Sequence, residues 1–177
     1  MIRRLLLEAI EQRLLLTITS VDWLPKRSYA DIDSVAISDS GKLALVVVDG
    51  IQPSDQAWLT DGSQENTRRI GPLSHPQWLG DTLFYAGFPG VHVVEAGSEP
   101  KAIADFSVAD IVARSTDVVF QNARTHEFWA SDGTLSGTRK LPGAAESQTD
   151  LYFVDDDVFA FERDGQNRVW RVEDDAT

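Results

Sequence analysis

The sequence predicts an all-β fold: a β-propeller-like array of about four four-stranded antiparallel blades, the last one incomplete, preceded by a short N-terminal helix. Three observations predict it. A Trp-x-x-Asp-Gly motif occurs twice, at Trp58 and Trp129, which are 71 positions apart (129 − 58). A fainter copy lies between them, in Val91 to Phe106. Short apolar runs separated by Gly, Asp, Ser and Pro repeat in the same order around each copy, which is typical of strands and turns.

Each repeat reads as strand, turn, strand, loop, strand, Asp-Gly turn, strand. The four repeats span about 31–71, 74–106, 108–142 and 149–177. A meander of this size cannot bury both faces of its sheet, so repeated sheets must cover one another. The fourth repeat stops inside its turn and leaves an open edge. We therefore expect the native chain to continue beyond Thr177, or an oligomer to complete the sheet.

The second and third strands of each repeat carry the bulky side chains and are expected to dominate the core. Burial of each aromatic side chain contributes about 2–3 kcal/mol. The second strands supply Val46, Val47, Phe84, Tyr85, Val119, Phe120, Phe159 and Phe161, and the third strands supply Trp58, Trp129 and Trp170.

The composition excludes several classes of protein. The chain has 177 residues, 42% of them hydrophobic and 25% charged, which is ordinary for a globular domain with a core. Its net charge of −12 repels phosphate backbones, so we expect no nucleic-acid partner. It contains no Cys, which excludes disulfides and Cys-ligated metals. No apolar run reaches the roughly 18 residues that a transmembrane span requires.

The first twenty residues differ from the repeats that fill 21–177. Apolar side chains recur at helical spacing from Ile2 to Ile10, which predicts an amphipathic helix that packs on the following domain or on a partner. A signal peptide requires an uninterrupted apolar stretch of roughly 7–15 residues, and Glu8 and Glu11 interrupt this one.

The repeated motif has a structural interpretation. Each Trp ends an apolar strand, the Asp-Gly pair makes a tight turn in which Gly takes positive φ and Asp caps nearby amides, and Thr adds a short hydroxyl. The basic pairs that follow, Arg68-Arg69 and Arg139-Lys140, lie on an outer strand and discourage edge-to-edge pairing. The motif residues are Trp58, Asp61, Gly62, Thr67, Trp129, Asp132, Gly133, Thr134, Gly137, Thr138 and Trp170. The alternative is a rim of Ca²⁺ loops, but a Ca²⁺ site needs about six oxygens, and one Asp per turn does not supply them.

The stretch "EFWASDGTLSGTRKL" resembles the ELWxxDGTxxGT repeat of bacterial extracellular proteins, with Phe128 in place of Leu. The earlier copy, "AWLTDGSQENTRRI", departs from that pattern, since Ser63 takes the place of the first Thr and Asn66 takes the place of the second Gly. The resemblance implies propeller-like domains in large surface proteins. "SVAISDSGKLALVVVDG" is also similar to the strand-turn-strand of TolB-like propellers, which implies the same architecture.

The N-terminal stretch "LLLEAIEQRLLL" is similar to the LEPR-XLL segment of bacterial surface proteins, with Gln12 in place of the usual Pro. The matching residues are Glu8, Ile10, Glu11, Arg13, Leu15 and Leu16. The resemblance implies a sorting signal, export, and a chain that begins a longer protein.

Catalytic constellations are not evident in the sequence. The three histidines, His75, His92 and His126, form no close pair of the His-x-x-x-His type, and neither a Gly-x-Ser-x-Gly elbow nor a phosphate loop occurs. A Ser-His-Asp set assembled across the fold stays open at this level. The acidic runs at 155–157 and 173–175 are interpreted as solvated turns, because no Asp-x-Asp-x-Asp-Gly loop is present.

We therefore expect a non-catalytic, exported or cell-surface propeller module with a structural or protein- or ligand-binding role. Its expected partners are other domains of a longer chain or other surface proteins, and it needs no cofactor unless Ca²⁺ binds. Two alternatives stay open: a cation- or glycan-binding propeller, and the propeller accessory domain of a larger TolB- or peptidase-like hydrolase.

Overall fold

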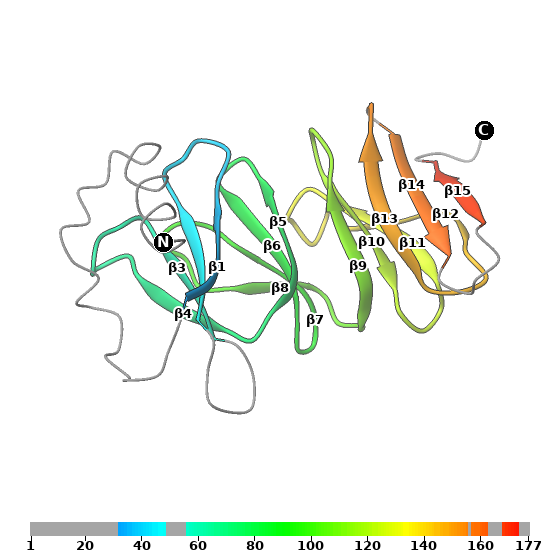
Figure 1. Ribbon diagram of the computed structural model, residues 1–177. Coiled ribbons are helices and arrows are strands. Elements are labelled where there is room, and N and C mark those ends of the chain that lie inside the picture. Colours follow the sequence, from blue (N-terminus) through cyan, green and yellow to red (C-terminus); the bar gives the residue numbers. More distant parts are fainter. Residues whose placement is uncertain (1–31, 49–55, 156, 163–167, 174–177) are drawn as a thin grey trace. The chain divides into compact units, whose positions relative to one another are not determined.

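The computed structural model describes residues 32–48, 56–155, 157–162 and 168–173. Within these residues every regular element is a β-strand, and the fifteen strands form four antiparallel sheets (Figure 1). This confirms the predicted all-β class and its four successive meanders. The helix expected in residues 1–20 lies outside the described residues. Among the described residues, no helix is long and apolar enough to cross a membrane.

The chain divides into two compact units, Met1–Pro72 and Leu73–Thr177, which are described separately. The first unit holds one sheet in which each strand pairs with the next along the chain. Its strands are β1 (Ile32–Ile37), β2 (Ala44–Val48), β3 (Gln56–Thr60) and β4 (Arg68–Gly71).

The second unit holds three sheets with the same connectivity. The first sheet contains β5 (Ser74–Leu79), β6 (Thr82–Gly87), β7 (Gly90–Val94) and β8 (Lys101–Ala104). The next contains β9 (Val108–Ala113), β10 (Val118–Asn122), β11 (Glu127–Ser131) and β12 (Arg139–Ala144). The last contains β13 (Thr149–Val154), β14 (Asp157–Glu162) and β15 (Val169–Val172).

The three sheets of the second unit pack face to face in chain order. Phe84 and Val91 of the β5–β8 sheet share one core with Ile111 and Phe120 of the β9–β12 sheet. The opposite face of β9–β12 shares a second core with β13–β15, formed by Val119, Phe128, Ala130, Leu141, Ala145, Leu151, Val158, Ala160 and Val172. The β9–β12 sheet is therefore covered on both faces, as a propeller blade is.

In the first three sheets most of the expected core residues are buried, whereas Val47, Trp58 and Trp129 are partly buried, and in the fourth sheet the expectation is partly wrong. Phe84 and Phe120 are fully buried, and Val46, Tyr85 and Val119 are buried as well. Phe161 and Trp170, by contrast, are 42% and 38% exposed. Phe161 points away from the β9–β12 sheet, because its neighbour Ala160 belongs to the core on the other side and side chains alternate along a strand. Trp170 lies on β15, the edge strand of the described sheet.

Candidate functional site: the repeated Asp-Gly loops

The loop between β11 and β12 contains the better copy of the motif and begins with a side-chain turn. Asp132 Oδ1 accepts hydrogen bonds from the Thr134 amide at 2.9 Å and from Thr134 Oγ1 at 2.8 Å. Gly133, between them, has φ 96°, a conformation that costs glycine little and other residues much more. The carboxylate therefore closes an Asx-type turn around the glycine.

Hydroxyl groups close the rest of this loop. Thr138 Oγ1 donates to the carbonyl of Thr134 at 2.7 Å and lies 2.8 Å from Ser131 Oγ. The same Ser131 Oγ accepts the amide of Gly133 at 3.1 Å, and Thr134 Oγ1 accepts the amide of Gly137 at 2.9 Å. The polar side chains of the motif are thus directed at the loop's own backbone.

The loop between β3 and β4 in the first unit repeats this construction. Asp61 Oδ1 accepts the amide of Ser63 at 2.9 Å and its hydroxyl at 2.7 Å, and Gly62 has φ 90°. Thr67 Oγ1 donates to the carbonyl of Ser63 at 2.5 Å and lies 2.6 Å from Thr60 Oγ1. Two loops in different sheets therefore share one hydrogen-bond scheme, which supports the interpretation of the motif as a repeated building element.

One position distinguishes the two loops. A β-carbon on Gly137 would lie 2.1 Å from Asp132 Oδ1, so no side chain fits there unless the carboxylate moves. Asn66 occupies the corresponding place in the first loop, and its Nδ2 donates to Asp61 Oδ2 at 2.7 Å. The first loop therefore has an Asn in place of the motif's second Gly, and this Asn adds a hydrogen bond to the carboxylate that the second loop lacks.

Both motif carboxylates are stabilised in their ionised form. Hydrogen bonds from the side chain and backbone of Thr134 hold the pKa of Asp132 below its usual range. Burial opposes ionisation of Asp61, but hydrogen bonds from Ser63 and Asn66 outweigh that effect and lower its pKa. At neutral pH both groups are acceptors and not proton donors, so neither suits general acid catalysis.

The described residues contain no cluster of three or more His, Asp or Glu side chains that could hold a metal ion. In both loops the carboxylate oxygen nearest the turn already accepts two hydrogen bonds, from Ser63 in one and from Thr134 in the other. The β11–β12 loop contains one carboxylate and the β3–β4 loop contains two, Asp61 and Glu65, far below the six to eight oxygens of a Ca²⁺ site.

The three tryptophans of the repeats occupy different environments. Trp129 is partly buried on the face of β9–β12 that meets the preceding sheet, and its ring lies 5.2 Å from that of Phe106. Trp58 is partly buried opposite Val46 in the first unit. Trp170 lies opposite Ala160 and is more exposed than either.

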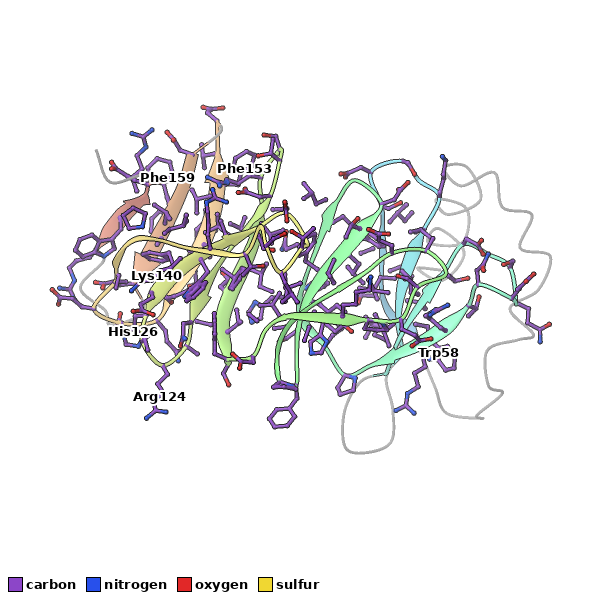
Figure 2. All side chains as sticks on the ribbon, turned by 180° about the vertical axis from the view of Figure 1, so that it is seen from behind. Trp58, Arg124, His126, Lys140, Phe153 and Phe159 are labelled. Atoms are coloured by element: carbon purple, nitrogen blue, oxygen red, sulfur yellow. The ribbon has the colours of Figure 1, made fainter. Side chains whose placement is uncertain are left out.

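The basic residues after the motif take part in ion pairs. Lys140, labelled in Figure 2, lies on β12 next to Glu127 on β11, with its Nζ 2.6 Å from Glu127 Oε1. Its hydrogen bond is the main cause that lowers the pKa of Glu127. Arg139 Nη2 lies 3.6 Å from Asp117 Oδ2. The Glu at the start of the motif and the basic residue after it thus form one cross-strand pair, in addition to the expected protection of the edge.

A second polar site, which sequence reasoning missed, ties together the first strands of the three sheets in the second unit. Asp110 Oδ1 lies 2.8 Å from His75 Nδ1, and Asp110 Oδ2 accepts the backbone amide of Leu151 at 2.7 Å. These residues come from β9, β5 and β13. Burial raises the pKa of Asp110, but the hydrogen bonds from His75 and the backbone amides outweigh it and leave the pKa lowered. The sequence signal was one acid inside the apolar run "VADIVA".

A buried amide makes a further junction between sheets. Gln121 is fully buried in β10. Its Nε2 donates to the carbonyls of His126 at 3.2 Å and Ser147 at 3.1 Å, and its Oε1 accepts the Thr149 amide at 2.8 Å. The remaining predicted residues, Glu8, Glu11, Arg13, Leu15 and Leu16 of the sorting-type segment, lie outside the described residues, as do Asp174 and Asp175.

No protein-family model and no curated protein matches the chain. Among solved structures, the chain is similar to the computationally designed protein Ika4, over 84% of this chain and 95% of the other, with 16% identity and a TM-score of 0.52. It also matches the designed protein Ika8, over 78% of this chain and 45% of that one, with 18% identity and a TM-score of 0.49. A prolyl endopeptidase matches over 81% of this chain and 27% of its own, with 13% identity and a TM-score of 0.45.

These identities are too low to carry function, and the likeness to Ika4 bears on the fold alone. Together with the stacked antiparallel meanders, it defines the class of protein: a β-propeller-like fold.

Proposed function

We propose that this protein is a non-catalytic β-propeller module, exported or displayed at the cell surface, with a structural and protein-interaction role. The observation that carries the proposal is the internal use of the repeated motif. The polar side chains of the motif that could carry chemistry, Asp132, Thr134 and Thr138, bond to their own loop. The same holds for the copy at Asp61.

The histidines support a non-catalytic role. His75 has an acid partner, Asp110, as the histidine of a hydrolytic triad does. In the described part of the chain, however, no Ser or Thr hydroxyl bonds to that ring, and the partner carboxylate also binds the backbone of β13. His92 Nε2 lies 3.0 Å from the Pro89 carbonyl and its ring stacks on Tyr85. These contacts join strands and turns.

The sequence resemblances support export. The stretch around Trp129 resembles a repeat of bacterial extracellular proteins, and Glu8 to Leu16 resembles a sorting segment of surface proteins. A chain without Cys is compatible with an oxidising compartment, since it has no thiol to oxidise.

Protease accessibility on intact source cells tests the proposed location. We expect an added protease to degrade the chain, detected with an antibody against it, while a cytosolic marker in the same cells stays intact. Protection of the chain until the cells are lysed would contradict export. The two alternatives, a cation- or glycan-binding propeller and a hydrolase accessory domain, predict saturable binding heats or a linked peptidase activity in the purified protein.

A further inference from the structure

The last sheet of the second unit has one covered face and one open face. Leu151, Val158, Ala160 and Val172 belong to the core shared with β9–β12. Since side chains alternate along a strand, the residues between them point to the other side. We call this side the outward face of β13–β15. Its apolar members are Tyr152, Val154, Phe159, Phe161 and Val169, drawn from all three strands.

The outward face is apolar and exposed as one patch. Tyr152 pairs with Phe159 across β13 and β14, and Phe161 pairs with Val169 across β14 and β15. Tyr152 is 52%, Val154 51%, Phe161 42% and Val169 51% exposed, and Phe159, labelled in Figure 2, is partly buried. The Tyr152 and Phe161 rings meet edge to face with centroids 5.1 Å apart. Single exposed apolar residues are ordinary, but a contiguous patch of this kind marks an interaction surface.

The neighbouring sheet shows what kind of element fits such a face. The corresponding face of β9–β12, with Val119 and Phe128, is covered by β13–β15 itself. Val119 in β10 and Phe159 in β14 occupy equivalent positions in their sheets. Each is followed by a core residue, Phe120 or Ala160, that pairs with the first strand of its sheet, at Ile111 or Leu151. The stack therefore continues with another β-sheet laid face to face, which in proteins packs at about 10 Å.

Charge indicates where a second copy of the chain can approach. Each copy carries a net charge of −12, so two copies repel over most of their surfaces. On the outward face, Arg171 Nη2 binds Asp157 Oδ1 at 2.7 Å and is also attracted by the carboxylate of Glu173, while Asp150 is partly buried. The face is thus mainly apolar and carries charges of both signs, so an identical face can oppose it.

We propose that the outward face of β13–β15 is the docking surface for a second copy of this chain, sheet against sheet about a two-fold axis. Such an isologous contact is the commonest arrangement among soluble oligomers. The inference rests on the proposed interaction role and names its surface and partner. The inference does not depend on where the protein resides. The protease-accessibility test of export can therefore fail while the association experiments below succeed, and the reverse.

Sedimentation of the full chain tests the association. We expect a dimer whose dissociation constant falls as NaCl is raised, because salt screens the repulsion between acidic copies. The double variant Phe161→Thr and Val169→Thr keeps strand-forming residues and removes apolar surface, and it should weaken the dimer by about tenfold or more. Phe88→Ser is the matched control, since Phe88 is 97% exposed on the β6–β7 turn and lies off this face; its dimer should persist.

Disulfide trapping tests the geometry on an otherwise native face. The chain has no Cys, so Phe161→Cys introduces its single thiol. Under mild oxidation this variant should form covalent dimers much faster than Phe88→Cys. A wild-type chain that stays monomeric at all concentrations would overturn the proposal and would indicate that the chain itself covers the face. A dimer that resists both face substitutions, or that gives no faster trapping at position 161, would overturn it as well.

Discussion

The carboxylate of Asp132 folds back over Gly137, so closely that a β-carbon at position 137 would lie 2.1 Å from Oδ1 and 2.3 Å from Cγ. The contact is possible only because residue 137 has no side chain. It explains in physical terms why the second Gly of the motif accompanies the Asp five positions earlier. In the first loop the corresponding residue is Asn66, whose side chain hydrogen-bonds to Oδ2 of the Asp61 carboxylate.

This relationship predicts an unusual order of substitutions at position 137. Gly137→Ala should destabilise the protein by about 1–3 kcal/mol, because the carboxylate must move and gains nothing in return. Gly137→Asn should cost less than Ala although it is larger, because its amide can bond the displaced carboxylate as Asn66 does. Urea unfolding of the full chain measures both. Leu135→Ala, at a 75% exposed neighbour, is the control, and an Asn variant less stable than the Ala variant would refute the explanation.

The hydrogen bonds that Asp110 accepts from His75 and from the backbone amide of Leu151 predict that the stability of the protein depends on pH. Hydrogen bonds from His75 and from backbone amides leave the pKa of Asp110 below its usual range in the folded state, despite burial. The unfolded value is about 3.9, so the folded state holds the proton more weakly. The stability that the carboxylate contributes is therefore present above that value and is lost as the pH falls through the lower folded pKa.

Asp110→Asn isolates this contribution. The variant should be less stable than the wild type at pH 7 and should lose less stability on acidification, so that the two unfolding free energies converge. Asp105→Asn, which removes an exposed acid nearby, should follow the wild-type slope. If the unfolding free energies of wild type and Asp110→Asn, measured with urea from neutral to acid pH, run parallel, the ionised carboxylate of Asp110 contributes nothing to stability.

Calcium should not bind at the Asp-Gly loops. The nearer oxygens of Asp61 and Asp132 accept hydrogen bonds from amide and hydroxyl donors, and a cation would have to displace those donors. We expect no saturable heat on titration with CaCl₂ and the same melting temperature in Ca²⁺ and in a chelator. A saturable signal that Asp132→Ala abolishes would restore the cation-binding alternative.

The sequence could predict the sheets and the motif because both depend on residues close together in the chain. The Asp132–Thr134 contact spans two residues and the Thr138–Thr134 contact spans four, so a repeated pattern reveals them. Ser131 was missed although it closes the same loop. The available signal was the hydroxyl residue at the same place in both copies, Thr60 in the first loop and Ser131 in the second.

The contacts between sheets could not be predicted in the same way. Asp110 and Leu151 are 41 residues apart, and Gln121 and Thr149 are 28 apart. No local pattern marks such pairs, because each partner lies in a strand with its own ordinary alternation. The exposure of Phe161 was missed for a related reason: its strand resembles the buried strand of the other repeats, and burial depends on the sheet that covers it.

The buried amide of Gln121 provides the last prediction. Gln121→Leu keeps the volume and removes the hydrogen bonds to the Thr149 amide and to the carbonyls of His126 and Ser147. The His126 carbonyl keeps the Ala145 amide as a donor, whereas the Thr149 amide and the Ser147 carbonyl lose the partner that Gln121 provides. Since an unsatisfied buried polar group costs about 1–3 kcal/mol, the variant should lose about 2–3 kcal/mol in urea unfolding. Gln148→Leu, an exposed amide that donates to the Ala123 carbonyl at 3.2 Å, should change stability by less than about 1 kcal/mol. Equal losses in the two variants would show that the apolar core, and not the Gln121 junction, joins the β9–β12 and β13–β15 sheets.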